Sequence, residues 1–381
     1  MTGENFMTIL NCAFEEKDME MFEYLTRNYD SMKRRERNEI LITTTRCAPD
    51  AAYLRHLVEK GADLGYQDKD GNTLLHHAAA SSSEDTVQYL IDGRLNIEAK
   101  NIAGDTPLYI AALESDNLAV LKTLIAAEAD INVRSNDGET LLIAAAGRNP
   151  SEDITRHLLK LGLNPNDRDD AGYTAVLNAA RWQSNASIID ILVDAGANIH
   201  DTAANGDTAF HLAAKNPSPN VAHYIMGSFL TSERNNEGMT CIETALMYAK
   251  SDEVVALYLR KQKEEQFFRA CMNEDFEIPF ALIRAGYDVN TASVHGTTAL
   301  MTAALHCTDI SVILMFFVYG AVTDCRDKKG RNFLHYAAAN QNAGVDFYES
   351  LRKDSRCEGL ESQTDLLGNK PEYYRSHKDE F

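Results

Sequence analysis

Apolar and polar residues follow one another along this chain in blocks of about 33 residues. Each block holds two stretches in which apolar residues stand three and four positions apart, as at Ile188, Ile191 and Leu192. That spacing predicts amphipathic helices. The segments between the stretches are rich in Gly, Asn and Asp, which predicts turns. The pattern therefore indicates a repeated helix–turn–helix unit.

A glycine followed two positions later by a threonine marks the start of most blocks. The marker glycines are Gly71, Gly104, Gly138, Gly172, Gly206, Gly238 and Gly296, and Gly330 is followed by Asn332 in place of the threonine. Successive intervals are 33, 34, 34, 34, 32, 58 and 34 residues, and the interval of 58 predicts a further unit that has lost about eight residues of its loop. Glycine accepts the positive φ of a tight turn, and the threonine can cap the helix that follows. Second helices end at a glycine such as Gly196, which predicts a left-handed C-terminal cap.

Extrapolating this period predicts eleven units. The apolar residues that open their first helices are Leu10, Ile42, Leu75, Leu108, Leu142, Val176, Phe210, Ile242, Phe267, Leu300 and Leu334. A twelfth turn begins at Asp365 and stops within its first helix. Paired alanines such as Ala179 and Ala180 recur in the first helices and would let neighbouring helices approach closely.

The segment from Asp68 to Ala79 reads Asp-Lys-Asp-Gly-Asn-Thr-Leu-Leu-His-His-Ala-Ala. It resembles the ankyrin-repeat pattern Asp-x-x-Gly-x-Thr-Pro-Leu-His-x-Ala-Ala, which precedes a second helix and Gly-Ala-Asp. The resemblance covers roughly residues 8–375. It implies an all-α ankyrin-repeat solenoid of about eleven helix–turn–helix units whose turns project as short β-hairpin fingers. The chain departs from the pattern because the proline is kept only at Pro107 and Pro371, and the histidine only at His76, His211 and His335.

We accordingly expect one solenoid over residues 1–381. Its expected parts are an N-terminal capping unit over 4–35, repeats over 36–262, a repeat without its finger over 263–290, repeats over 291–353, and a C-terminal partial unit and tail over 354–381. The polar segment from Lys353 to Thr364 is expected to be a solvated loop.

Composition and charge narrow the class of partner. The formal net charge is −20, which disfavours binding to nucleic-acid phosphates. It favours a protein partner with a basic surface, although the same charge is explained by solubility alone. Seven cysteines without a CxxC pair suit buried thiols in a reducing compartment, here the cytoplasm. No signal peptide is expected at the N-terminus, and the longest apolar run, Val312–Val318, is too short to insert across a membrane.

The sequence predicts no catalytic residues, no metal ligands and no cofactor. His76, His211 and His335 are expected to cap and bridge helices. The neighbours His306 and Cys307 would point in different directions on a helix. Phosphate-binding glycine loops and calcium loops are absent from the sequence.

The resemblance implies that the fingers and first helices line a concave groove. The residues after the turn glycine and after the Ala-Ala pair vary between units, so we expect them to have no packing role and to contact a partner. The predicted partner-binding residues are Tyr173, Arg181, Trp182, Asp207, Met239, Met247 and Tyr248 in the centre, with Asp105, Glu114 and Glu139 as an acidic flank. Trp, Tyr and Arg are typical of interface hot spots, and Trp182 is the single Trp of the chain. The alternative is that Trp182 packs against the adjacent unit as core.

Together these features predict a monomeric, non-enzymatic scaffold or adaptor for protein–protein interaction. One alternative is an acidic inhibitor or immunity-type protein that masks a basic partner. Another is a secreted bacterial effector delivered to a host cytosol. A third is an enzyme with a site hidden in the groove or in the C-terminal stretch.

Overall fold

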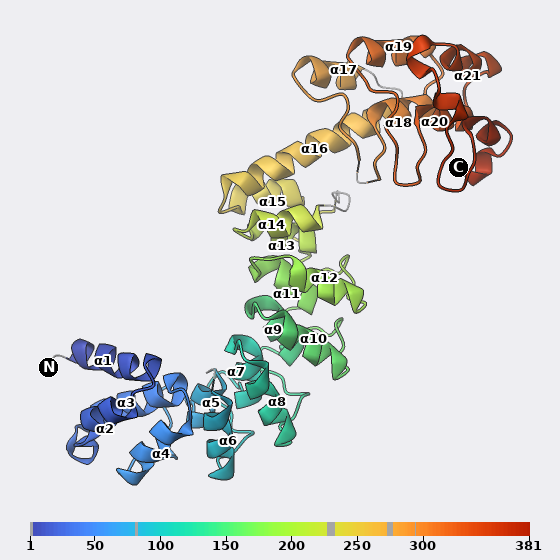
Figure 1. Ribbon diagram of the computed structural model, residues 1–381. Coiled ribbons are helices and arrows are strands. Elements are labelled where there is room, and N and C mark those ends of the chain that lie inside the picture. The colour runs from blue at the N-terminus through green and yellow to red at the C-terminus, as the bar shows by residue number, and fades with distance from the viewer. Residues whose placement is uncertain (1–2, 81–82, 227–232, 273–276, 294) are drawn as a thin grey trace. The chain divides into compact units, whose positions relative to one another are not determined.

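The computed structural model describes residues 3–80, 83–226, 233–272, 277–293 and 295–381, and its regular elements are helices (Figure 1). The first helices of successive units are α3 (Arg34–Cys47), α5 (Leu74–Ala79), α7 (Pro107–Glu114), α9 (Leu141–Arg148), α11 (Ala175–Trp182), α13 (Ala209–Lys215), α15 (Cys241–Tyr248), α18 (Ala299–His306) and α20 (Phe333–Ala339). The second helices are α4 (Ala51–Glu59), α6 (Glu84–Asp92), α8 (Leu118–Ala126), α10 (Glu152–Lys160), α12 (Ser187–Asp194), α14 (Pro219–Ile225), α17 (Glu277–Arg284), α19 (Ile310–Val318) and α21 (Val345–Arg352). The prediction of an all-α fold is confirmed.

The remaining elements lie near the two ends of the chain and at one junction. They are α1 (Gly3–Glu15), α2 (Met19–Thr26), the 3₁₀ turn η1 (Tyr29–Ser31), the long helix α16 (Asp252–Met272), and the 3₁₀ turns η2 (Ser355–Cys357), η3 (Leu360–Ser362), η4 (Pro371–Arg375) and η5 (Lys378–Glu380). The described residues form two compact units, and the boundary between them falls at Val255 and Ala256, inside α16. The single solenoid over 1–381 stays a prediction, and each unit is described by itself.

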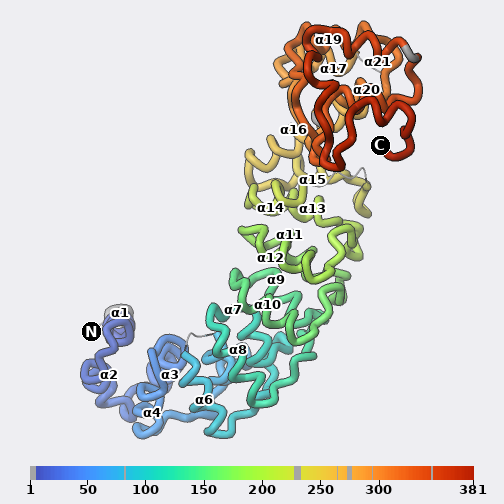
Figure 2. The backbone as a smooth tube through the Cα atoms, turned by 45° about the vertical axis from the view of Figure 1, so that its right-hand side comes forward, coloured from blue at the N-terminus to red at the C-terminus, as the bar shows by residue number. Residues whose placement is uncertain are grey.

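Within the first unit, helices of the same kind pack in two layers. Helices α5, α7, α9 and α11 contact one another in sequence, and α6, α8, α10 and α12 do the same in the second layer (Figure 1). The paired alanines lie at the first-layer contacts, where Ala179 and Ala180 are fully buried. Figure 2 traces the backbone from each second helix through a turn to the next first helix. We call each of these turns a finger.

Each finger is held by glycine geometry and by the finger before it. Gly172 has a φ of +78°, and a Cβ there would lie 2.8 Å from the backbone nitrogen of Ala204 in the next finger. That approach allows Ala204 N to donate a 2.9 Å hydrogen bond to Ala171 O. The same bond joins Asn236 N to Asn205 O at 3.0 Å. Four of the described fingers are closed by one isolated antiparallel bridge each, as between Thr202 and Thr208.

Three histidines, His76, His211 and His335, each connect one finger to the next, in the bridging role that was predicted. His211 Nδ1 lies 2.8 Å from Thr208 Oγ1, and its Nε2 lies 2.9 Å from Met239 O in the following finger. His76 makes the same pair of contacts to Thr73 and to Asp105 O. Burial lowers the pKa of His76 and favours its neutral form, which can accept at one ring nitrogen and donate at the other. These histidines are structural bridges between units.

A ladder of buried side-chain amides, which sequence analysis missed, joins the first helices. Gln183 Nε2 donates 2.9 Å hydrogen bonds to Ala146 O and Asn149 O, at the end of the preceding first helix. Asn216 Nδ2 donates in the same way to Ala180 O and Gln183 O, at 2.9 and 2.8 Å. The ladder residues occupy the C-cap of their own helix. The expectation that residues after the Ala-Ala pair have no packing role was therefore wrong for Asn216 and Asn340, which are 1% and 2% exposed.

The unit expected to lack its finger begins inside α16. This helix covers both the expected second helix of one unit and the expected first helix of the next. Residues 252–272 contain no Gly or Pro, so nothing in the sequence ends the helix between the two units. The unit continues in α17 and ends at Gly286, with a φ of +94°. Residues 273–276 of the predicted unit lie outside the described residues.

The segment from Lys353 to Thr364 differs from the solvated loop that was expected. It forms η2 and η3, and Cys357 and Leu360 are 1% and 3% exposed within the core of the second unit. The C-terminal turn then begins at Asp365, and Gly368 has a φ of +85°. Isolated apolar residues in this polar stretch were the signal that could have revealed the packing.

Left-handed caps at the ends of second helices generate a stability prediction. Gly196 has a φ of +92°, whereas Glu128, at the equivalent position, has a φ of +68° with a side chain. Glu128→Gly relieves the left-handed strain, partly offset by glycine entropy, and should raise the free energy of unfolding by up to about 1 kcal/mol. Gly196→Ala should lower it by about 1 kcal/mol, although its Cβ would meet no atom within 4 Å.

Urea unfolding followed by circular dichroism measures both changes. Ala127→Gly, one position earlier at a φ of −85°, is the matched control and should destabilise by about 0.5–1 kcal/mol. A loss of stability in Glu128→Gly equal to that of the control would contradict the strain argument.

Candidate functional site

The residues that follow each turn glycine and those in the last turn of each first helix form what we call the finger–helix surface. Trp182 ends α11 on this surface and is 54% exposed. The helix end beneath it is fixed because the next residue, Gln183, is buried in the amide ladder. The structure therefore presents the indole to solvent from a rigid position. The alternative of Trp182 as a buried core residue is wrong.

Arg181 lies against the indole. Its guanidinium carbon is 4.6 Å from the Trp182 ring centroid, and Nη1 donates a 3.0 Å hydrogen bond to Lys215 O. A cation–π contact at an exposed site contributes about 0.5–1 kcal/mol. The pair thus holds one face of the ring and orients it before any partner arrives.

A buried ion pair supports the next unit. Asp207 is fully buried and accepts from Lys215 Nζ at 2.6 Å and from Asn235 Nδ2 at 2.8 Å. Burial opposes ionisation, but the hydrogen bonds from Lys215 and Asn235 outweigh it and hold the pKa of Asp207 below its usual value. Lys215 Nζ also lies 5.5 Å from the centroid of the Tyr248 ring. The structure places Asp207 beneath the surface, where it positions Lys215, so the carboxylate is not presented to a partner as predicted.

The last turn of α15 presents an apolar group. Leu246, Met247 and Tyr248 are 58%, 67% and 44% exposed. Met247 and Tyr248 were predicted to contact a partner, but Leu246 was missed because it stands at the second position of the Ala-Ala pair, which is buried in other units. The exposure of three neighbouring apolar residues is unusual for a helix end and favours contact with another molecule.

Tyr173 and Met239, the residues after their turn glycines, are half-buried. Tyr173 N donates to Asp169 Oδ1 at 2.7 Å, and Met239 N donates to Asn235 Oδ1 at 3.0 Å. Burial raises the pKa of the Tyr173 hydroxyl, and the Asp207 carboxylate adds to the effect. Their backbones are therefore fixed by the fingers, while their side chains lie at the edge of the surface.

The acidic flank is partly engaged within the protein. Glu139 Oε2 accepts from Tyr109 Oη at 2.5 Å. Burial raises the pKa of Asp105, and the Glu139 carboxylate contributes to that rise. Glu114 is exposed and its carboxylate lies 3.8 Å from Arg46, a pair of half-exposed groups that contributes about 0–1 kcal/mol. Of the three predicted flank residues, Glu114 is the one that presents its charge most openly.

Three basic residues lie around the turn glycine Gly330 of the second unit, at Lys328, Lys329 and Arg331. Arg331 is not presented as a free charge, because its Nε lies 2.7 Å from the buried carboxylate of Asp327. Its surroundings are described with the C-terminal segment below.

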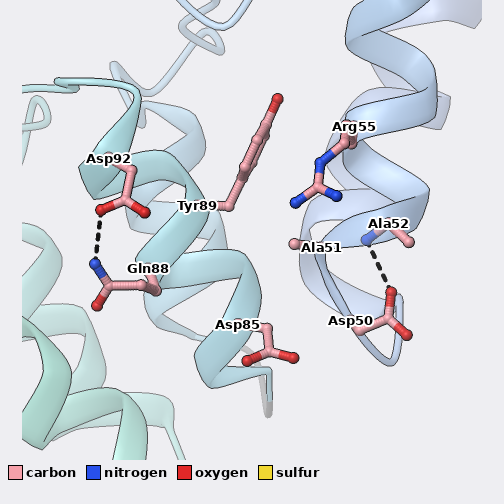
Figure 3. Close-up of a pocket in the computed structure, with 8 residues that line it drawn as sticks. All are labelled: Asp50, Ala51, Ala52, Arg55, Asp85, Gln88, Tyr89 and Asp92. Atoms are coloured by element: carbon pink, nitrogen blue, oxygen red, sulfur yellow. Dashed lines mark hydrogen bonds between the residues drawn. The ribbon is translucent and has the colours of Figure 1, made fainter.

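A separate open pocket of about 380 Å³ lies between α4 and α6, in the layer of second helices (Figure 3). Tyr89 and Arg55 face each other across it, with 5.5 Å from the guanidinium carbon to the ring centroid. Three carboxylates line it, of which Asp50 caps α4 at Ala52 N and Asp92 accepts from Gln88. Asp50 and Asp92 are therefore already engaged within their own helices, and the third carboxylate, Asp85, lies in the first turn of α6.

Neither a group of metal ligands nor a membrane-spanning helix is found among the described residues. No group of three or more His, Cys, Asp or Glu side chains among them is placed to hold a metal ion. No helix in the described ranges is long and apolar enough to cross a bilayer. Cys307 is buried, and its Sγ lies 3.2 Å from Asp309 O.

Comparison with known proteins identifies the repeated unit. A family model described as ankyrin repeats, in three copies, matches residues 46–135, 112–203 and 267–354. Serine/threonine-protein kinase 12 of Arabidopsis thaliana is 33% identical over 75 residues, which are 20% of this chain and 16% of the kinase. The chain thus spans less than a fifth of that relative's length.

Two solved structures are similar over about half of the chain. One is a chain from the complex of a predatory endopeptidase from Bdellovibrio bacteriovorus with an immunity protein, with 29% identity, a TM-score of 0.41, and coverage of 49% of this chain and 96% of the other. The second is the human ASB11 ankyrin repeat domain, with 19% identity, a TM-score of 0.46, and coverage of 55% and 91%.

The buried pair beneath the surface gives a pH-dependent prediction. Asp207→Asn leaves the Lys215 ammonium without its counter-charge and should lower the free energy of unfolding by about 3 kcal/mol at pH 7. The pKa of Asp207 is lower in the folded state than its ordinary 3.8. The contribution of its charge is therefore complete above about pH 5 and is lost as the pH falls through the folded-state value.

Urea unfolding of the wild-type protein and of Asp207→Asn between pH 7 and pH 3 should give curves that converge at the acid end. Lys215→Met in the Asp207→Asn background should recover part of the loss. The exposed pair Glu152–Arg156 supplies the control, since Glu152→Gln should change stability by less than about 0.5 kcal/mol. A constant difference between the curves at all pH values would contradict the assigned charge.

Proposed function

Because this chain belongs to the ankyrin-repeat family, we propose that it is a non-enzymatic scaffold that binds a protein partner on the finger–helix surface of its first unit. Ankyrin repeats bind protein partners, and the family fold exposes that surface from a rigid frame. The observation that carries the proposal is the exposure of Trp182, Met247 and Tyr248, with Trp182 at a helix end that the buried bonds of Gln183 fix in place.

The centre of the proposed site has the chemistry of an interface hot spot. Trp182 and Tyr248 are aromatic and half-exposed, and each is contacted by a cation of its own chain, Arg181 or Lys215. Aromatic and arginine side chains dominate the binding energy of protein interfaces. Met247 adds an adaptable apolar side chain. Because Trp182 and Tyr248 are contacted by these cations before binding, less conformational entropy is lost when a partner covers them.

We propose that the partner has an apolar anchor and a basic rim. The net charge of −20 supports long-range attraction of a basic protein. The exposed carboxylate of Glu114 and the half-buried Asp105 supply acidic groups on one flank of the apolar centre. The charge also favours a second candidate function, an inhibitor or immunity-type protein that masks a basic enzyme or toxin. An activity assay on the recovered partner distinguishes the two, because an inhibitor lowers the partner's activity whereas an adaptor leaves it unchanged.

The proposed absence of enzymatic function is supported by the thiols and histidines. Burial raises the pKa of Cys271 and of Cys357 to about 12, which disfavours a nucleophilic thiolate. His76, His211 and His335 are engaged in bridging fingers. We also propose that the chain is monomeric and acts in the cytoplasm, or in a host cytosol if it is delivered as an effector. The absence of a disulfide among its seven cysteines, all within the described residues, supports a reducing compartment.

Replacing the exposed indole tests the proposed surface. Trp182→Ala should weaken binding of the partner by about 2 kcal/mol or more, roughly thirtyfold in Kd, because it removes a central aromatic anchor. Affinity purification with mass spectrometry identifies the partner, and titration calorimetry then measures the Kd for the purified pair.

Tyr24→Ala is the matched control, since Tyr24 on α2 is 63% exposed, contacts an arginine of its own chain and lies outside the finger–helix surface. The control should change the Kd less than twofold. Equal affinities for wild-type and Trp182→Ala, with unchanged unfolding curves, would show that the surface was wrongly assigned.

A further inference from the structure

In the second unit, the chain itself covers the finger–helix surface of the last full repeat. Arg331 follows the turn glycine Gly330, Tyr336 lies in the middle of α20, and Asn340 caps the end of that helix. Arg331 follows its turn glycine as Tyr173 does in the first unit, and Asn340 caps its first helix as Gln183 does there. Residues 376–381 fold back from η4 onto these three residues.

Phe381 occupies the surface with its ring and its main chain. The ring centroid lies 4.7 Å from that of Tyr336 in an edge-to-face arrangement, and the guanidinium carbon of Arg331 lies 4.0 Å from the Phe381 centroid. Arg331 Nη1 also donates a 2.6 Å hydrogen bond to the main-chain oxygen of Phe381. Arg331 is held for this contact by the buried Asp327. Arg331, which Asp327 already holds in position, thus contacts both the aromatic ring and the main-chain oxygen of Phe381.

Lys378 makes the hydrogen bond that a side-chain amide of the following unit makes elsewhere in the amide ladder. In the first unit, the C-cap carbonyl Asn149 O accepts from Gln183, the ladder residue of the following unit. In the last full repeat, the corresponding carbonyl, Asn340 O, accepts a 2.7 Å hydrogen bond from Lys378 Nζ. A lysine in the folded-back segment therefore satisfies a carbonyl that a further unit would otherwise bind.

The segment is also attached to η4, where His377 stacks on the Tyr373 ring, Tyr373 Oη donates to Glu380 at 2.5 Å, and the Tyr374 and Phe381 rings meet edge to face at 5.2 Å. Turn η5 contains no buried residue, and Ser376, His377, Asp379 and Glu380 are all exposed. Lys378 and Phe381 are only half-buried. An open pocket of about 130 Å³ lies beside Lys378, lined in part by Phe347 and Tyr348. By contrast, η4 is anchored by the buried residues Pro371 and Tyr374. Residues 376–381 can therefore leave the surface while η4 stays in place.

We propose that the Arg331–Tyr336–Asn340 surface is a peptide-binding site that residues 376–381 occupy in cis as a displaceable ligand. The site takes a short segment folded as a 3₁₀ turn, with a lysine three residues before an aromatic residue, the arrangement of Lys378 and Phe381. A partner segment of that chemistry binds by displacing the resident one. The site lies in the second unit, so the proposal stands independently of the binding surface around Trp182.

Removing the resident segment tests the proposal. The probe is a fluorescein-labelled peptide with the sequence Ser-His-Lys-Asp-Glu-Phe of residues 376–381. Fluorescence anisotropy compares its binding to the full chain and to a chain that ends at Arg375. A short tether gives the resident segment an effective concentration in the millimolar range. The truncated chain should therefore bind the peptide at least about tenfold more tightly than the full chain.

The matched peptide Ser-His-Ala-Asp-Glu-Ala lacks both anchors and should bind the truncated chain at least about tenfold more weakly. The full-length double variant Lys378→Ala with Phe381→Ala provides a second opened form and should bind the probe like the truncated chain. Equal binding of the probe to the full and truncated chains, or equal binding of the two peptides, would overturn the proposal. Unfolding of both the truncated chain and the double variant would also overturn it, because the segment would then be an integral part of the core.

Discussion

The carbonyl groups at the end of each first helix impose the constraint on which the rest of this structure depends. A helix end leaves its last carbonyls without partners inside the helix, and here those carbonyls are buried between units. The next unit satisfies them, as when Gln183 bonds Ala146 O and Asn149 O and is itself bonded by Asn216. An unsatisfied buried carbonyl costs about 1–3 kcal/mol. Each unit is therefore stable only when its neighbour is in register.

The fingers repeat the same dependence at the other end of the first helices. Each finger accepts one backbone hydrogen bond from the next, and His76, His211 and His335 add a second link where they occur. Both kinds of bond are made by atoms that point along the stack. Side chains such as Trp182 and Met247, which point away from it, remain free to vary. In the second unit, Lys378 supplies the corresponding bond to Asn340 O.

The features that sequence could predict were those determined by local backbone geometry. Turn glycines such as Gly172 follow from the positive φ of the turn, and threonine caps such as Thr174 follow from the unpaired N–H groups at a helix start. Paired alanines such as Ala179 follow from the close approach of neighbouring helices. All three kinds of position were predicted correctly. The all-α class followed from these. The left-handed Glu128 was not predicted, because the packing of the stack imposes there a conformation that its own side chain disfavours.

Features that depend on a neighbouring unit were missed or misplaced. The amide ladder connects residues more than thirty positions apart, so its Asn and Gln residues looked like variable surface positions. Asp207 was predicted at the interface, but Lys215 and two asparagines draw its carboxylate inward. The fused helix α16 depends on the loss of a finger. The structure describes how exposed the residues around Trp182 are and which contacts hold them. That they bind a partner stays a prediction.

Site-specific photo-crosslinking tests the central claim most directly, which is that a protein partner binds the surface built by the fingers and first helices. A photoreactive phenylalanine analogue is introduced singly at Trp182, at Met247 and, as the control, at Gln88 in the layer of second helices. The three proteins are irradiated with the purified partner, and adducts are mapped by mass spectrometry. Our account predicts strong adducts from positions 182 and 247 and little or none from position 88. Adducts that form mainly from position 88 would contradict it.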